Sequence, residues 1–202
     1  MRRNTFLYIP NIIGYLRILL AIGAFWQWEQ SNRFFLLYLT SFLLDAADGY
    51  AARYFHQSSE LGALLDMLTD RCATAALLTL LSHLYKQYVL IFLFCIVLDG
   101  FSHWLQMIAG LASGTTSHKQ AGRFTLLKIY YWRPVLTLAC LLNELCFLCL
   151  YLLHFLSSSS DWSKLVHIVF YVSLPICILK QFISLLQVWS SYIIIFDTFT
   201  ST

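Results

Sequence analysis

Residues 45–70 read DAADGYAARYFHQSSELGALLDMLTD, and the rest of the chain is organised around this stretch. It holds four aspartates, Asp45, Asp48, Asp66 and Asp70, inside or at the ends of long apolar runs. A carboxylate is costly among apolar residues of this kind, and one that is retained there usually belongs to a functional site. The stretch therefore predicts two neighbouring apolar helices that carry a shared acidic site.

The spacing of the aspartates predicts that the two acidic faces meet. Asp45 and Asp48 are three residues apart, so they share one face of the first helix, and Asp66 and Asp70 are four apart on the second. The connection at 56–60 is short enough to force the two helices into an antiparallel pair. All four carboxylates are therefore expected to point into one space.

Four converging carboxylates repel one another and cannot all stay ionised in a low dielectric without a cation. An all-oxygen donor set suits a hard ion such as Mg²⁺ or Mn²⁺ and has no soft ligand that would favour zinc. Gly49, Ala52 and Gly62 stand beside the acids, where small side chains let a bulky ligand approach the backbone. Arg53 adds a positive fork that matches phosphate. The pattern predicts a metal-bound phosphate ligand.

A simpler interpretation of the acids remains open. They could be helix-end carboxylates with buried ion-pair partners such as Arg17 and Arg71. This alternative requires no metal and no substrate.

The composition predicts a membrane protein. Of 202 residues, 59% are hydrophobic and 11% are charged, against roughly 45–50% and 25% in soluble domains. A span needs about 20 apolar residues, so we expect an all-α polytopic protein with about six transmembrane helices in one domain, 1–202. The expected spans are 6–28, 34–53, 61–83, 88–109, 134–155 and 165–189, the last running on toward 196. Residues 110–132 are expected to form one long loop. The net charge of +3 comes without a basic stripe, so no nucleic-acid partner is expected.

The remaining polar and sulfur-containing residues of the spans have less specific interpretations. Asp99, Ser102, His103 and Gln106 form one helical stripe. Asp99 and His103 could be a metal pair or a proton relay. A mutually satisfied buried network, or residues that line the cavity, are expected instead because no third ligand is spaced to join them. Lys180 is expected to be a counter-ion or to line a cavity. The six cysteines fall in apolar runs and give no sign of an oxidised ectodomain. Cys146 and Cys149 have CxxC spacing, but without a partner pair they are expected to be small buried hydrophobes and not metal ligands or a redox couple.

The distribution of positive charge predicts the orientation in the membrane. An even number of spans puts both termini on one side of the bilayer. The loops of that side hold seven basic residues: Arg2, Arg3, Arg53, Lys119, Arg123, Lys128 and Arg133. The loops of the other side hold three: Arg33, Lys86 and Lys164. The positive-inside rule therefore places the termini and the acidic site on the cytosolic side.

The acidic stretch also resembles a known family. The pattern D-x2-D-G-x2-A-R-x8-G-x3-D-x3-D is the signature of the CDP-alcohol phosphatidyltransferases, and all eight of its specified residues are present. Within that family the segments 8–17, 65–72, 129–134 and 143–144 are most similar to those of the eukaryotic inositol-lipid synthases. The resemblance implies transfer of a phosphatidyl group from CDP-diacylglycerol to myo-inositol, with release of CMP.

The resemblance also implies roles for individual residues. Asp45, Asp48, Asp66 and, at their edge, Asp70 would form the site for divalent ions. Asp70 would also be the general base toward the inositol hydroxyl. The cytidine and phosphate site would be lined by Gly49, Ala52, Arg53, Ser59 and Gly62. Asn11 and Arg17 would border the cavity; a helix cap and a structural counter-ion are their alternative roles. For inositol the candidates are His118, Lys119 and Arg133.

Finally, the resemblance implies a homodimer in the endoplasmic reticulum membrane, with the lipid bilayer as its surroundings. Two other functions remain open. One is the same chemistry on another alcohol, namely glycerol phosphate, serine or diacylglycerol, because the signature does not separate these acceptors. The other is cation transport, which midplane charges would also fit, although no internal repeat is present and the acids crowd into one third of the chain.

Overall fold

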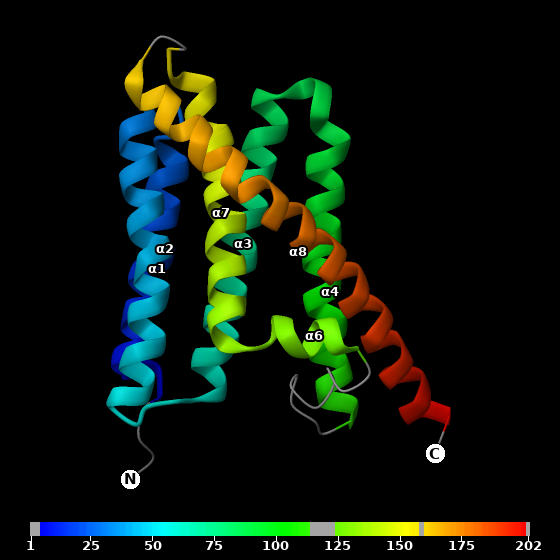
Figure 1. Ribbon diagram of the computed structural model, residues 1–202. Helices are drawn as coiled ribbons and strands as arrows, with labels where there is room; N and C mark the ends of the chain where they lie inside the picture. The colour runs from blue at the N-terminus through cyan, green and yellow to red at the C-terminus, as the bar shows by residue number, and fades with distance from the viewer. Residues whose placement is uncertain (1–4, 114–123, 158–159, 201–202) are drawn as a thin grey trace. The chain divides into compact units, whose positions relative to one another are not determined.

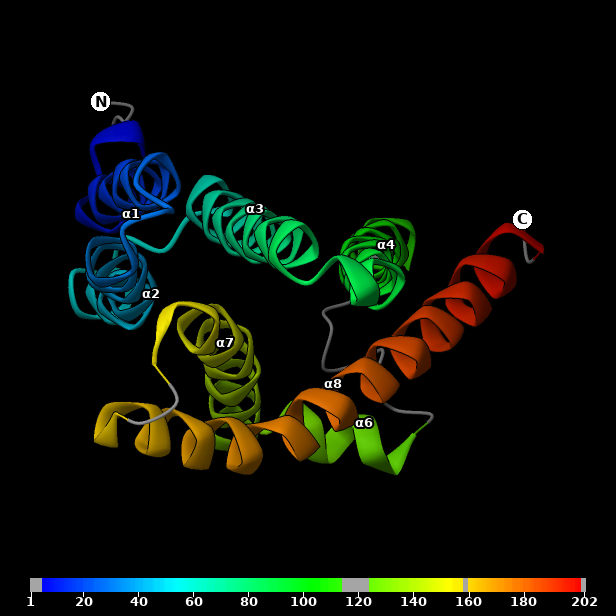
Figure 2. The ribbon, with the colours of Figure 1, turned by 90° about the horizontal axis from the view of Figure 1, so that it is seen from above.

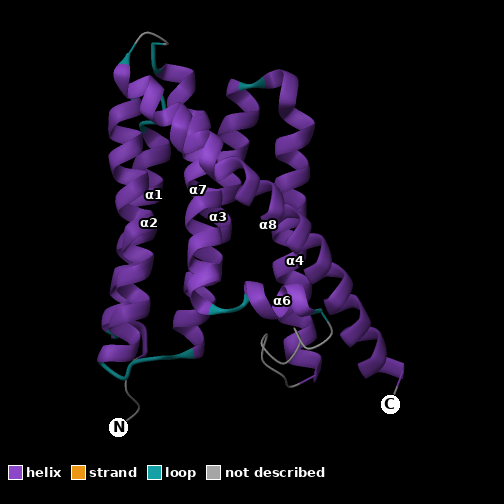
Figure 3. Ribbon diagram, viewed as in Figure 1, coloured by secondary structure: helices purple, strands orange, loops and turns teal. Residues whose placement is uncertain are grey.

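The computed structural model describes residues 5–113, 124–157 and 160–200. Within these ranges every regular element is a helix, and no strand occurs (Figure 3). The expected all-α class is confirmed.

Within the described residues, six long helices overlap the six stretches expected to be spans. They are α1 (Ile9–Trp26), α2 (Ser31–Tyr54), α3 (Glu60–Leu84), α4 (Val89–Ser113), α7 (Arg133–Phe155) and α8 (Asp161–Thr200). The short elements are η1 (Thr5–Leu7), η2 (Lys86–Tyr88) and α6 (Thr125–Tyr130). The last helix is longer than expected, and it continues through Pro175.

Four stretches among the described residues are long and apolar enough to cross a membrane: Ile9–Trp26, Lys86–Ala112, Arg133–Phe155 and Asp161–Thr200. The helices α2 and α3 have 24 and 25 residues, which gives each about 36 Å at 1.5 Å per residue, enough for a hydrocarbon core of about 30 Å. They are less apolar because they carry the four aspartates and several basic residues. The two helices that hold the site are thus long but polar.

The expectation of one loop over 110–132 was wrong in part. The helix α4 runs on to Ser113, and α6 occupies Thr125–Tyr130. The reason is an apolar face: Leu127 and Tyr130, three residues apart, are buried in a cluster with Ala139 of α7 and Ile183 of α8.

The chain forms two compact units, Met1–Ala76 and Leu77–Thr202, with the boundary inside α3. We call them the N-terminal and C-terminal units. The single domain expected from the sequence stays a prediction.

In the N-terminal unit, α1 and α2 lie side by side along their length (Figures 1 and 2). Their shared end is fixed by aromatic rings: Phe25 of α1 lies edge-on to Phe34 and Tyr38 of α2, with centroids 5.4 and 5.8 Å away. Such pairs add to the free energy of apolar burial. The packing sets the relative position of the opposite, acidic ends.

The turn from α2 to α3 has a defined geometry. His56 has φ 51°, and the backbone N–H groups of His56 and Gln57 donate to the carbonyls of Arg53 and Ala52 at 3.3 and 2.9 Å. This is the Schellman arrangement, in which a left-handed residue ends the helix. The chain therefore reverses within five residues of the α2 terminus, as the short connection predicted.

In the C-terminal unit, α8 packs against both α4 and α7 (Figure 2). The Lys180 ammonium donates to Asp99 Oδ1 at 3.1 Å, and both residues are buried. His103 Nδ1 lies 3.8 Å from the same carboxylate oxygen. The expected buried network is confirmed, and Lys180 is the counter-ion of Asp99.

Hydrogen bonds to Tyr131 also connect α4 and α8, because its hydroxyl accepts from the amides of Gln106 of α4 and Gln187 of α8. All six cysteines are free. Cys146 and Cys149 are buried, which confirms the expectation for these two residues, and Cys72 is exposed.

Candidate active site

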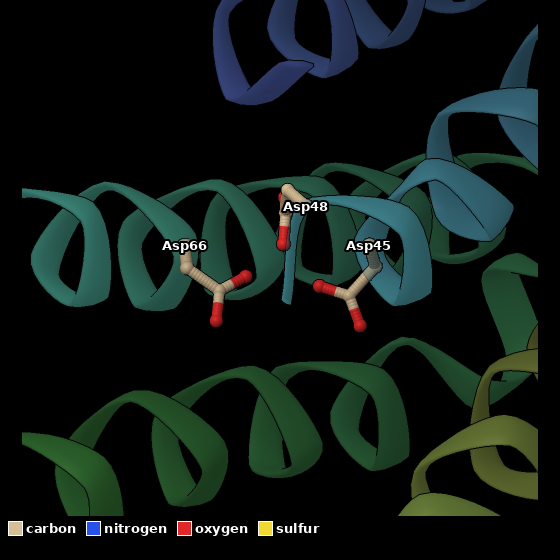
Figure 4. Close-up of side chains that lie close together, drawn as sticks. All are labelled: Asp45, Asp48 and Asp66. Carbon is tan, nitrogen blue, oxygen red and sulfur yellow. The ribbon is translucent and has the colours of Figure 1, made fainter. Parts of the chain in front are cut away.

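Three carboxylates converge from two helices. Asp45 and Asp48 come from α2 and Asp66 from α3, and Figure 4 shows their carboxylates turned toward one another. One oxygen of each lies within 4.8 Å of the others. The Asp48 side chain is 10% exposed, whereas those of Asp45 and Asp66 are 38% and 46% exposed. The group is therefore anchored at Asp48 and accessible at the other two.

One guanidinium lies against all four aspartates. Arg17 Nη1 donates to Asp48 Oδ2 at 2.7 Å and to Asp66 Oδ1 at 2.8 Å. Its Nη2 lies 2.9 Å from Asp45 Oδ1 and 2.5 Å from Asp70 Oδ1. The Arg17 side chain is 2% exposed. The counter-ion interpretation of Arg17 is confirmed, and it places Arg17 inside the site and not merely beside it.

Asp70 occupies the edge of the group, as expected. It is not among the three residues that could share an ion, and its side chain is 32% exposed. Its second oxygen lies 3.6 Å from Arg71 Nη2. Asp70 is therefore reachable while still held by two arginines.

The small residues of the signature leave room for close contacts. A Cβ on Gly62 would lie 2.8 Å from Asn11 Oδ1 and 3.2 Å from Ser59 Oγ, and a Cβ on Gly49 would lie 3.4 Å from Arg53 Nη1. Glycine at 62 thus lets α1 approach the start of α3, whereas at 49 a Cβ would make only an ordinary contact with the arginine fork. The expectation that these residues leave space for a ligand stays a prediction.

The polar residues around Gly62 also have structural partners. Ser59 Oγ accepts from the Gly62 N–H at 3.0 Å, which is the bond of an N-cap residue. Asn11 is buried, and its amide donates to the Thr5 carbonyl at 2.7 Å. Ala52 is half-buried and Arg53 is exposed at the end of α2. The roles expected of these residues toward a nucleotide stay predictions.

Two supporting residues were missed by the sequence analysis. Gly14 lies on the buried stripe of α1 between Asn11 and Arg17, and a Cβ there would be 2.9 Å from Leu65 Cδ2. Ser41 is buried, and its hydroxyl donates to the Arg17 carbonyl at 2.8 Å. Gly14 could have been predicted from its spacing, because it lies three residues from both Asn11 and Arg17 on one face of the helix. Nothing in the sequence pointed to Ser41.

The residues expected to bind inositol are not brought together by the described part of the chain. His118 and Lys119 lie outside the described residues. Arg133 is the exposed first residue of α7 and belongs to the C-terminal unit. Their proposed role stays a prediction.

The carboxylates fit a hard divalent ion. Ligand oxygens around one Mg²⁺, each at about 2.1 Å, lie no more than about 4.2 Å apart. Oxygens that already lie within 4.8 Å of one another need only small side-chain rotations to share an ion. The donor set offers oxygen alone, which suits Mg²⁺ or Mn²⁺.

Comparison with known proteins gives one family. Residues 7–200 match the CDP-alcohol phosphatidyltransferases. The chain is 42% identical over 190 residues to a CDP-diacylglycerol–inositol 3-phosphatidyltransferase of Drosophila melanogaster, covering 92% of this chain and 84% of that protein. The identity to the enzyme of that name from Homo sapiens is 42% over 193 residues, 91% and 89% of the two chains. For Candida albicans it is 41% over 197 residues, 96% and 84%. No solved structure matches the chain.

Proposed function

Because the chain belongs to the CDP-alcohol phosphatidyltransferase family, we propose that it transfers the phosphatidyl group of CDP-diacylglycerol to myo-inositol, giving phosphatidylinositol and CMP. The observation that carries this proposal is the convergence of Asp45, Asp48 and Asp66 in a chain whose relatives with that printed name match it over almost its whole length.

The reaction requires a binding site for the diphosphate, access for the acceptor alcohol and a group that accepts its proton. Asp45, Asp48 and Asp66 would hold Mg²⁺ or Mn²⁺, which when bound neutralises phosphate charge and stabilises the leaving CMP oxygen. The exposure of Asp45 and Asp66 leaves this side of the site accessible to a substrate.

Asp70 is the proposed general base. It takes the proton of an inositol hydroxyl while that oxygen forms a bond to the phosphorus that bears diacylglycerol. The bond from this phosphorus to the CMP oxygen breaks, and its electron pair leaves with CMP. A carboxylate at the edge of the metal-binding group, 32% exposed, can meet an acceptor that arrives from water without giving up a place as a ligand.

The nucleotide end of CDP-diacylglycerol is assigned to the turn between α2 and α3. The exposed Arg53 would pair with phosphate through its planar fork, and Gly49, Ala52 and Gly62 would allow close approach of the ligand. The Ser59 hydroxyl keeps donor capacity beyond the bond that it accepts from Gly62. Asn11 and Arg17 form the wall on the α1 side.

Assembly and location are proposed on the family and the charge pattern. We expect a homodimer in the endoplasmic reticulum membrane, with both termini and the acidic site on the cytosolic side. Cytosolic access would match the source of nucleotide substrates.

The test is CMP release by the purified full chain in lipid nanodiscs with CDP-diacylglycerol and Mg²⁺ or Mn²⁺. Separate reactions receive myo-inositol, serine and glycerol 3-phosphate. Release that depends on myo-inositol supports the proposal. Strong release with serine or glycerol 3-phosphate but not with inositol rejects the acceptor. Metal-dependent cation flux across sealed proteoliposomes, without CMP release, would favour transport.

A further inference from the structure

The placement of Arg17 has a consequence for how the site binds a cation. The two Nη nitrogens of this guanidinium lie 2.5–2.9 Å from oxygens of four carboxylates, two from α2 and two from α3. A guanidinium has only five N–H donors in a rigid fork. Nearly all of its bonding capacity is therefore spent on the residues that would hold the metal.

The remaining donor of Arg17 is Nε, which is buried and has no hydrogen-bond partner among the described residues. A buried donor left without an acceptor is unfavourable. The contacts of the two Nη atoms with the carboxylates therefore hold the guanidinium in this position, since its Nε contributes no hydrogen bond among the described residues. Its backbone, by contrast, is anchored, since the Ser41 hydroxyl donates to the Arg17 carbonyl.

The charges in the site point to competition between Arg17 and a cation. Asp45, Asp48 and Asp66 are at once the candidate ligands of a divalent ion and partners of Arg17. A fixed positive charge within 3 Å of an oxygen of each ligand repels a divalent cation. Arg17 and an ion on these three carboxylates would therefore compete for the same negative charge.

We propose that Arg17 is an exchangeable counter-ion that holds the four aspartates together in the absence of metal and lowers the affinity of the site for divalent ions. This inference rests on the proposed metal-dependent reaction. Arg17 is a positioning residue: it acts on the substrate through the carboxylates and the ion they hold.

The site without metal and the site with metal differ in charge, and this difference explains why a built-in cation is useful. Without metal, four ionised carboxylates with no cation among them would repel one another and open the packing of α1, α2 and α3. A built-in cation prevents this opening. Because a guanidinium does not leave the chain, it can take the place of the ion whenever the ion dissociates, and the ion would therefore remain exchangeable between the binding of CDP-diacylglycerol and the release of CMP.

The test measures binding of Mn²⁺ itself, by electron paramagnetic resonance of the free ion, to the full chain in nanodiscs without nucleotide. Arg17→Gln removes the charge and keeps a polar side chain, and Arg17→Lys keeps the charge with fewer contacts. Arg71→Gln is the matched control, because that arginine lies 3.6 Å from one aspartate, Asp70, which is outside the three-ligand group.

We expect Arg17→Gln to bind Mn²⁺ at least tenfold more tightly than the original chain, Arg17→Lys to lie between them, and Arg71→Gln to change the affinity less than threefold. Mn²⁺ should also raise the unfolding temperature of Arg17→Gln more than that of the original chain. Arg17→Gln that folds only when Mn²⁺ is present supports the proposal as well, because the ion then replaces the guanidinium.

An Mn²⁺ affinity of folded Arg17→Gln that is unchanged or weaker overturns the proposal. If Arg17→Gln does not fold even with Mn²⁺, Arg17→Lys decides: an affinity equal to that of the original chain overturns the competition, and a tighter one supports it. Mn²⁺ binding is measured without the acceptor alcohol. If the original chain does not release CMP, the proposed function is rejected, and the competition between Arg17 and the ion is still judged by Mn²⁺ binding.

Discussion

The substitution Asp70→Asn tests the proposed division of labour among the aspartates. It keeps the size and shape of the side chain and removes the ability to accept a proton. We expect turnover to fall about 10²–10⁴-fold, the range for loss of a general base. Binding of CDP-diacylglycerol and of Mn²⁺ should change less than threefold, because Asp70 is outside the three-ligand group.

The magnitude of the effect separates catalysis from folding. A loss of 10²–10⁴-fold corresponds to about 3–5 kcal/mol in the activation free energy. The Asp70 side chain is 32% exposed, whereas its partner Arg17 is 2% exposed. An asparagine oxygen can still accept from Arg17, and the other three carboxylates stay on the guanidinium. The unfolding temperature of the variant therefore separates loss of the base from loss of folding.

The assay is the initial rate of CMP release at saturating CDP-diacylglycerol and myo-inositol, together with the unfolding temperature of each variant. Asp161→Asn is the matched control: its side chain is 95% exposed at the start of α8, and it should turn over at the original rate. If Asp70→Asn is folded and keeps a rate within threefold of the original chain, another group is the base.

Three further tests concern the fold around the site and in the C-terminal unit. Gly62→Ala puts a Cβ 2.8 Å from the side-chain oxygen of Asn11, so we expect lower thermal stability and slower CMP release. The control is Gly100→Ala, where a Cβ meets nothing within 4 Å; this variant should be as stable as the original chain or more stable by up to about 1 kcal/mol. Equal losses of stability in both variants would contradict the packing argument. His56→Gly relieves a left-handed φ of 51° and should raise the unfolding free energy by about 1 kcal/mol, seen as a higher unfolding temperature; a lower one would mean that the histidine side chain stabilises the turn. Lys180→Met leaves the buried Asp99 without its cation and should destabilise the protein by about 3–5 kcal/mol. Adding Asp99→Asn should recover part of that loss, and additive losses in the double variant would show that the pair is not coupled.

The residues of the acidic site could be chosen from the sequence because they obey a local rule. Three- and four-residue spacings fix which side chains share a face of a helix, and Asp45, Asp48 and Asp66 do converge. The long helices could also be assigned, since runs of about 20 apolar residues are sufficient to span a bilayer. The short helix α6 could not, because six residues carry little periodic signal and its formation depends on burial against α7 and α8.

By itself, the sequence determined that the chain is helical, that it is suited to a membrane and that its acids face one another. These properties follow from composition and from helical periodicity, which act over a few residues. Only the tertiary structure decided that Arg17, 31 residues before Asp48 in the chain, contacts all four aspartates. That contact depends on how closely α1 approaches α2 and α3. The approach is possible because Gly14 has no side chain where α1 meets Leu65, and it is set by packing between residues far apart in sequence.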